Sequence, residues 1–153
     1  MSDRVVFWAH QIADIAVLVI ILLSRDSLAI DGTLSRALGF GGFGAGVLLV
    51  IWSGLHLRRP SKKIGDIEPV SDTLVTTGPY AFVRHPYYLG WIIAFLGLSI
   101  GLMSLWGLVA TPLLMVPTAI AHASREEEAL ERMFGEEWKE HVARTSFLFP
   151  PIY

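Results

Sequence analysis

The chain has 153 residues, of which 53% are hydrophobic and only 17% are charged, and its formal net charge is −2. A soluble domain carries about 25% charged residues, so this composition favours an integral membrane protein of a single domain, residues 1–153. The small acidic charge argues against a nucleic-acid partner. The absence of cysteine excludes disulfides, thiolate catalysis and Cys-based metal sites, so no metal is expected.

The first apolar segment, residues 5–23, is long enough to cross a bilayer as a helix. It lacks a small-residue cleavage site, which predicts a retained span and not a signal peptide. His10 and Asp14 share a face of this helix because they lie one turn apart. An ionisable group inside a span usually faces protein or water, so Asp14 is a candidate functional residue. The alternative is a polar clamp between helices, with Asp14 paired to His10.

The second apolar segment, residues 38–57, opens with the glycine-rich text "LGFGGFGAG". Gly42 and Gly46 form a GxxxG pair, and Gly97 and Gly101 form another further along. This spacing lets two helix backbones approach closely in lipid. The glycine faces could therefore pack helices within the chain or support a dimer, and the oligomeric state stays open.

Residues 88–123 contain no Asp, Glu, Lys or Arg. As one helix they would be about 54 Å long, too long for a single crossing of a hydrocarbon core of about 30 Å. A break near residues 101–106 would give two short spans in a tight hairpin, the second kinked or held part-way by Pro112 and Pro117. The predicted fold is therefore all-α, an integral membrane bundle of about four transmembrane helices.

Four spans would place both termini and the polar loop 58–87 on one side of the membrane. That side would hold ten of the 12 Lys and Arg residues. The positive-inside rule then predicts that both termini and the polar loop are cytoplasmic, at the cell membrane if the source is prokaryotic. Within this loop, "TLVTT" at residues 73–77 is β-prone but too short for a sheet, so we expect an extended segment lying on the protein.

The tail, residues 124–144, is predicted to be an amphipathic cytoplasmic helix, because Leu130, Phe134 and Trp138 recur at helical spacing. Glu127 falls at the centre of this apolar face, and Glu126 lies about 100° to one side. A carboxylate at that place suggests contact with protein or ligand. The alternative is a solvated first helical turn stabilised by the helix dipole.

The stretch "GPYAFVRHPYYLG", residues 78–90, places a cation, an imidazole and aromatic rings just before an apolar run. Pro86 is expected to hold His85 in an extended conformation. Arg84 could hold a carboxylate with its fork of donors. Three rings could cover a flat ligand or a cation: Tyr80, Tyr87 and Tyr88. The alternative, an aromatic belt at the membrane interface, is favoured for Tyr87.

Two motifs in this chain resemble those of the isoprenylcysteine carboxyl methyltransferase family and of related phospholipid methyltransferases. They are "LVTTGPYAFVRHPYYLG" and, after a hydrophobic hairpin, "EEALERMFGEEW", and the likeness covers about residues 72–153 with the closing "FLFPPIY". The resemblance implies a membrane enzyme that uses S-adenosylmethionine. It also implies methyl transfer to a lipophilic acceptor from the bilayer, either a prenylcysteine-type carboxylate or a lipid-like molecule.

The resemblance also implies which residues contact the cofactor: Thr73, Leu74, Val75, Tyr80, His85, Tyr88 and one of Glu126 and Glu127. The helix-face argument favours Glu127 and the resemblance leans to Glu126, so both are kept. The family usually has an arginine where this chain has His122, and His122 or Arg125 could substitute for it. The catalytic candidates are His85, Glu127 and His122. An amine or hydroxyl acceptor would need one of the two histidines as a base, whereas a carboxylate acceptor would need none.

Two other functions remain open from the sequence. Membrane sterol reductases carry a similar Arg-His-Pro-x-Tyr and use NADPH, although this chain has few basic groups to spare for a 2′-phosphate. A non-catalytic membrane scaffold with a GxxxG interface is the other alternative.

Overall fold

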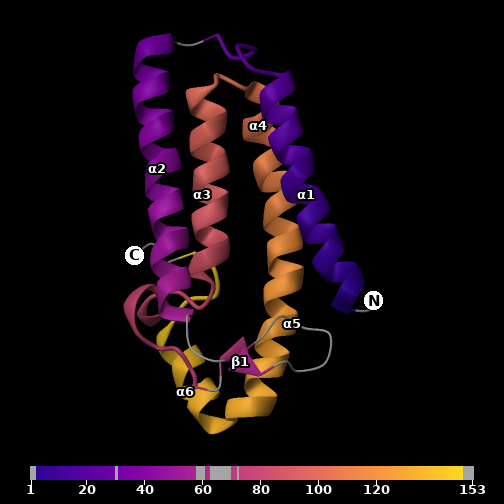
Figure 1. The fold of residues 1–153 in the computed structure, drawn as a ribbon, viewed down its shortest axis with the longest axis vertical. Coiled ribbons are helices and arrows are strands. Elements are labelled where there is room, and N and C mark those ends of the chain that lie inside the picture. The colour runs from indigo at the N-terminus through magenta and orange to yellow at the C-terminus, as the bar shows by residue number, and fades with distance from the viewer. Residues whose placement is uncertain (1–2, 30, 58–60, 63–69, 72, 150–153) are drawn as a thin grey trace.

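Helices dominate the computed structural model, which describes residues 3–29, 31–57, 61–62, 70–71 and 73–149, and the long ones run along one axis (Figure 1). In chain order the helices are α1 (Asp3–Leu23), α2 (Gly32–Leu57), α3 (Pro86–Gly101), α4 (Leu105–Ala110), α5 (Val116–Phe134) and α6 (Glu136–Arg144). A π-helical stretch, η2 (Thr111–Met115), joins α4 to α5, and a 3-10 turn, η1 (Gly78–Ala81), precedes α3. The predicted all-α class is confirmed.

A short antiparallel pair accompanies the helices in the segment between α2 and α3. Its strands are β1 (Ser61–Lys62) and β2 (Val70–Ser71), with Ser61 opposite Ser71. Residues 73–77 follow without regular secondary structure. The rest of the loop between α2 and α3 lies outside the described residues.

Three helical segments among the described residues are long and apolar enough to cross a membrane: Arg4–Leu23, Gly32–Leu57 and Leu105–Phe134. The chain is therefore a multi-pass membrane protein. The helix α3, with 16 residues, is apolar but shorter than these. It corresponds to the third predicted span, so the count of four spans stays a prediction.

The predicted break in the long apolar run is present between Gly101 and Leu105. Met103 adopts a positive φ of 52°, and the Ser104 side chain accepts a hydrogen bond from the amide of Gly107 at 2.9 Å, which caps α4. The helix then continues through Pro112, where the π-helical stretch accommodates the missing N–H of the proline. The prolines therefore do not stop this helix part-way.

The helices α2 and α3 pack closely through their glycines, and Figure 1 shows them side by side. A Cβ added at Gly39 would collide with the backbone of Gly101, and one added at Gly46 would collide with the backbone of Ala94. The close approach predicted from the glycine spacing thus occurs within the chain.

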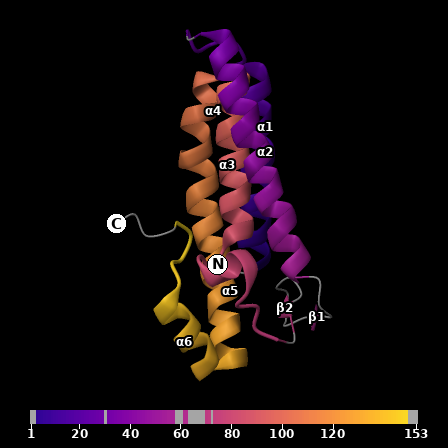
Figure 2. The same ribbon diagram turned by 90° about the vertical axis from the view of Figure 1, so that its left-hand side faces the viewer.

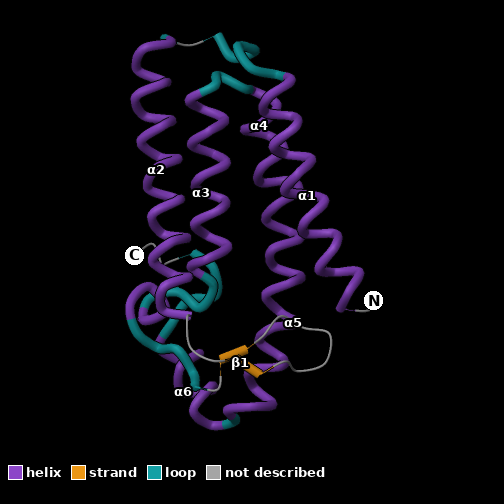
Figure 3. The backbone as a smooth tube through the Cα atoms, viewed as in Figure 1, coloured by secondary structure: helices purple, strands orange, loops and turns teal. Residues whose placement is uncertain are grey.

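The two turns at one end of the bundle lie next to each other (Figure 3) and are joined by backbone hydrogen bonds. The amide of Asp26 donates to the carbonyl of Leu102 at 3.0 Å, and the amide of Leu28 donates to that of Met103 at 2.8 Å. The opposite end gathers the start of α1, the end of α2, the start of α3 and the end of α5 with α6 (Figures 1 and 2). Segments far apart in the sequence therefore meet at that end.

The predicted tail helix, residues 124–144, is two helices. Gly135 has a positive φ of 52° and separates α5 from α6, a conformation that glycine adopts without steric cost. Because α5 begins at Val116, the glutamates at 126–128 lie in its interior. The alternative of a solvated first turn is therefore wrong.

Candidate functional site

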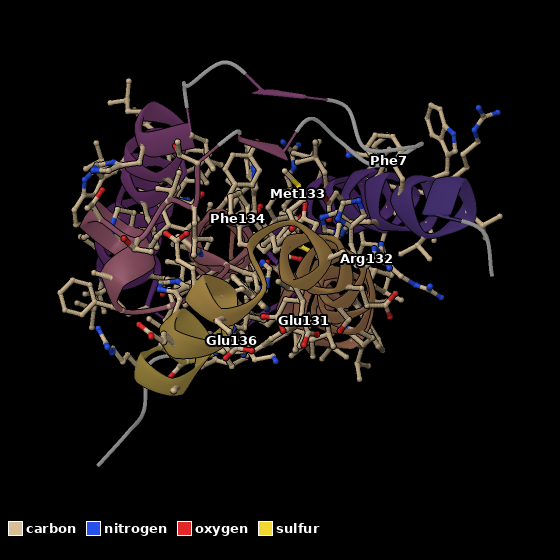
Figure 4. All side chains as sticks on the ribbon, turned by 90° about the horizontal axis from the view of Figure 1, so that it is seen from below. Phe7, Glu131, Arg132, Met133, Phe134 and Glu136 are labelled. Carbon is tan, nitrogen blue, oxygen red and sulfur yellow. The ribbon has the colours of Figure 1, made fainter. Side chains whose placement is uncertain are left out.

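A cavity of about 520 Å³ lies where the sequence-distant segments meet. Its wall is formed by α1, α3, α5 and α6, by the last residue of α2 and by residues from the segment 73–85. Figure 4 shows this end from below, with Phe7 of α1 on one side and Glu131 and Glu136 on the α5–α6 side. The volume falls in the range of pockets that bind small molecules and cofactors.

Most of the site residues predicted from the sequence line this cavity. They are Thr73, Leu74, Val75, Tyr80, His85, Tyr88, His122 and Glu126. Glu127 is not part of the cavity wall but contacts His85 behind it. Arg125 points elsewhere, because its guanidinium lies 3.6 Å from Glu128 and its side chain is 39% exposed. Of the two proposed substitutes for the family arginine, only His122 reaches the cavity.

The segment before α3 is held by the chain that follows α6. Val83 bridges to Ser146, the amide of Arg84 donates to the carbonyl of Ser146 at 2.8 Å, and the amide of His85 donates to that of Phe147 at 3.2 Å. His85 has φ −121° and ψ 57°, so its ψ lies short of the extended value expected before Pro86. The backbone pairing positions the His85 ring, which is only 5% exposed.

The two glutamates approach His85 from opposite sides of its ring. Glu127 Oε1 lies 3.1 Å from His85 Nε2, and Glu126 Oε2 lies 3.5 Å from His85 Nδ1. Burial by itself would lower the pKa of His85, but its hydrogen bonds to the two carboxylates and their charges outweigh this, so the pKa is raised above its usual value. The arrangement favours an imidazolium held between two carboxylates.

The Arg84 side chain binds groups on two other segments of the protein. Its Nε donates to Glu127 Oε1 at 2.6 Å and its Nη1 donates to the carbonyl of Thr145 at 2.6 Å, while the guanidinium lies 5.6 Å from the centre of the Phe147 ring. The carboxylate predicted for the Arg84 fork is therefore that of Glu127. This pair ties α5 to the segment before α3.

A second hydrogen-bonded chain runs along the cavity wall from α5 to α3. The Tyr88 hydroxyl donates to Glu126 Oε1 at 2.8 Å and lies 2.7 Å from His122 Nδ1. Because the phenol has one proton and gives it to Glu126, His122 Nδ1 carries a proton and donates to Tyr88. Tyr80 closes the cavity nearby, and burial, with the Glu126 charge, raises its pKa, so it stays a neutral phenol.

Sequence reasoning missed part of the wall, notably Trp91 and Phe95 on α3 and His141 on α6. The spacing of Tyr87, Trp91 and Phe95, one helical turn each, was available as a signal for a shared face. The cavity therefore combines aromatic rings with the carboxylates of Asp14 and Glu126. The rings and carboxylates suit a positively charged group of a ligand, whereas Arg84 and His85, which line the same cavity, suit a negatively charged one.

Residues 34–137 match the family model described as phospholipid methyltransferase. Phosphatidylethanolamine N-methyltransferase B of Dictyostelium discoideum is 32% identical over 119 residues, which cover 76% of this chain and 60% of that protein. Methanethiol S-methyltransferase 1 of Bradyrhizobium diazoefficiens is 37% identical over 73 residues, covering 46% of this chain and 24% of that protein. Protein-S-isoprenylcysteine O-methyltransferase of Homo sapiens is 36% identical over 87 residues, which cover 52% of this chain and 28% of that protein.

The match to the family model begins at residue 34, upstream of the region where the resemblance was expected to start. The resemblance inferred from the two motifs is confirmed. The chain spans less than two thirds of the length of each of these three relatives.

Proposed function

Since the chain belongs to the phospholipid methyltransferase family, we propose that it transfers a methyl group from S-adenosylmethionine to a lipophilic acceptor that enters from the bilayer. Members of this family use S-adenosylmethionine as the methyl donor. The names of the three relatives give three different acceptors: phosphatidylethanolamine, methanethiol and an isoprenylcysteine. For this chain we therefore propose a class of acceptor, which is lipid-like or of the prenylcysteine type. Family membership argues against the alternative NADPH-dependent reductase.

One observation carries the proposal. The segment before α3 and the paired glutamates of α5, more than 40 residues away in the sequence, meet at His85 on the wall of a cavity of small-molecule size. A non-catalytic scaffold would need neither the cavity nor the buried charges, which are costly in a membrane protein.

The cavity residues fit a sulfonium cofactor. The rings of Tyr80 and Tyr88 and the carboxylate of Glu126 suit its positive charge. His85 and Glu126 are proposed to hold its charged amino-acid end, and the remaining contacts are proposed for Thr73, Leu74 and Val75. Glu127 is proposed to act through His85, whose ring it orients with the help of Arg84.

When bound, S-adenosylmethionine supplies an activated methyl group on a positively charged sulfur. The protein's own contribution is to hold the acceptor in line with that group, and positioning of this kind can supply about 7–11 kcal/mol. The aromatic wall excludes water, which favours a reaction in which charge is dispersed or neutralised. If the acceptor is an amine or a hydroxyl, His122 is proposed as the base, because the two carboxylates hold the other candidate, His85, as an imidazolium.

The topology proposed for this activity is one domain, residues 1–153, with α3 as a fourth membrane crossing. Both termini and the cavity would then face the cytoplasm, where the cofactor is made and where most Lys and Arg residues lie. The helix α6, with Trp138 and His141 buried and its other face charged, is proposed to lie at the membrane surface. The glycine faces of α2 and α3 pack against each other within the chain, so the GxxxG spacing needs no second copy to explain it.

The test is binding and transfer of radiolabelled S-adenosylmethionine by the protein purified in detergent. We expect His85→Ala to weaken cofactor binding at least tenfold, about 1.4 kcal/mol, as expected for loss of a charge-assisted contact. His56→Ala, a histidine outside the cavity, is the matched control. A folded His85→Ala variant that binds the cofactor like the wild type in calorimetric titration would contradict the assignment. A transfer screen against phosphatidylethanolamine, prenylcysteine and total membrane lipid then identifies the acceptor.

A further inference from the structure

The segment after α6, residues 145–149, turns back along the bundle (Figure 2) and lies against the residues that precede α3. It is held there by the backbone hydrogen bonds described above, and its Leu148 is buried in the hydrophobic core. Its last three residues open the closing motif "FLFPPIY", to which the proposed methyl transfer gives no task. The backbone of Phe147 is therefore fixed beside the cavity.

The Phe147 ring lies next to two cationic side chains. The guanidinium carbon of Arg84 lies over this ring, 5.6 Å from its centre. The centre of the His85 ring lies 5.0 Å from that of Phe147, and the two ring planes are tilted by 59°. An aromatic ring attracts a cation within about 6 Å of its centre, because its face carries partial negative charge. Phe147 is therefore placed to stabilise the charged form of both side chains.

Shielding from water strengthens this attraction. The side chain of Arg84 is 10% exposed, and His85 is buried. Because solvent stabilises a shielded cation poorly, the protein groups around it decide how firmly the cation is held. For both residues the ring of Phe147 replaces part of the stabilisation that water would give.

The carboxylates of α5 are divided between several donors. Arg84 Nε and His85 Nε2 bind the same oxygen of Glu127, Oε1, at 2.6 Å and 3.1 Å. Glu126 lies 3.5 Å from His85 Nδ1 and also accepts a hydrogen bond from Tyr88. The two cations share one carboxylate oxygen and repel each other, so a further partner common to both stabilises the arrangement.

Tyr88 of α3 and His141 of α6 also face this cluster. The centre of the Tyr88 ring lies 5.8 Å from that of His85, and its hydroxyl donates to Glu126, so it is a neutral phenol. His141 lines the same cavity, and burial together with the Arg84 charge lowers its pKa. Both side chains are therefore uncharged near neutral pH, and neither opposes the charge of His85.

We propose that Phe147 is a positioning residue of the cofactor site, whose ring holds Arg84 and His85 in place as cations on the cavity wall. These cations suit the carboxylate at the amino-acid end of S-adenosylmethionine, and Glu126 suits its ammonium. The effect on the cofactor rests on the methyl transfer proposed above, whereas the effect on the two cations does not.

Phe147 also packs against the hydrophobic core, so the test must separate the charge distribution of the ring from its packing. Phe147→Leu keeps an apolar side chain but removes the ring. Pentafluorophenylalanine incorporated at position 147 keeps the ring and nearly its shape, but reverses the charge distribution of its face. Phe149, two residues along the chain and 51% exposed, is the matched control, as Phe149→Leu and as the same fluorinated residue.

The first measurement is the titration of His85, followed by NMR of the histidine ring protons in detergent without cofactor. Its signal is the one missing from the spectrum of His85→Ala. Loss of the ring's attraction destabilises the imidazolium, so we expect the midpoint to fall by about 0.5–1 pH unit in Phe147→Leu and in the protein fluorinated at 147. Both Phe149 controls should titrate like the wild type.

The second measurement is calorimetric titration of S-adenosylmethionine at several pH values. Above the wild-type midpoint, a shift of about 0.5–1 pH unit lowers the protonated fraction of His85 about threefold to tenfold. We expect both changes at Phe147 to weaken cofactor binding by about that factor there. The difference from the wild type should shrink below both midpoints, a dependence on pH that a loss of packing would not produce.

A wild-type His85 midpoint in the protein fluorinated at 147 would overturn the inference even if Phe147→Leu does not fold, because fluorination changes the charge distribution and hardly the packing. An equal shift in the Phe149 controls, or a shifted midpoint with wild-type cofactor affinity, would overturn it as well. Failure of the proposed function looks different: the His85 midpoint would still depend on the ring, while the wild type bound no S-adenosylmethionine.

Discussion

The substitution Glu127→Gln tests whether the paired glutamates of α5 have separate tasks. In the structure Glu127 accepts hydrogen bonds from Arg84 at 2.6 Å and His85 at 3.1 Å but does not line the cavity, whereas Glu126 does line it. We therefore expect Glu127→Gln to act mainly on stability and Glu126→Gln mainly on cofactor binding. The amide keeps the size of the side chain but removes its charge.

The expected loss of stability follows from the charge-assisted hydrogen bonds that Arg84 and His85 lose when Glu127 becomes an amide. Removing one partner of a fully buried charge pair costs about 3–5 kcal/mol. Here the Glu127 side chain is 21% exposed and Arg84 keeps the carbonyl of Thr145, so we expect about 1.5–3 kcal/mol, typical of hydrogen bonds to charged groups. For a chain of this length that is a fall in the unfolding midpoint of roughly 3–12 °C.

The assay is thermal unfolding in detergent, followed by tryptophan fluorescence, together with calorimetric titration of S-adenosylmethionine. Glu128→Gln is the matched control, because Glu128 is 55% exposed and pairs with Arg125 at the surface. Its midpoint and affinity should equal those of the wild type. A Glu127→Gln variant with a wild-type midpoint and lost cofactor affinity, beside an unaffected Glu126→Gln, would refute this division of tasks and support the sequence-based choice of Glu127.

Three further predictions concern packing, pH and topology. Gly39→Ala should destabilise the α2–α3 pair by about 1–3 kcal/mol in the same thermal assay, whereas Gly41→Ala, which meets nothing within 4 Å, should be neutral or slightly stabilising. Because the pKa of His85 is raised from 6.5, its contribution to stability is complete below about pH 6.5 and is lost as the pH rises through the folded-state pKa. The unfolding midpoint should fall over that interval, and an equal fall in the Glu126→Gln, Glu127→Gln double variant would contradict the assignment. Reporter fusions at the two termini should both report the cytoplasm, and a reporter on the far side at the C-terminus would exclude four spans.

Much of the candidate site was predictable because its residues belong to motifs that are contiguous in the sequence. Tyr80, His85 and Tyr88 lie within one short stretch, and their residue types suffice to suggest contact with a flat or cationic ligand. The relation between Glu126 and Glu127 was not predictable in the same way. Helix periodicity places Glu127 at the centre of the apolar face, and it does face protein, but what it meets there is the Arg84 side chain and the back of His85.

The sequence by itself determined the membrane class, the break after Gly101 and the close packing of the glycine faces, because hydropathy, helix length and the missing Cβ of glycine act within one segment. Only the tertiary structure decided that α1 completes the cavity with His10 and Asp14, and that the chain after α6 holds His85 through Phe147. The physical reason is that periodicity specifies which face of a helix is buried but not which partner buries it. That choice depends on how all the helices pack together, and so does the position of every charge they bring into the cavity.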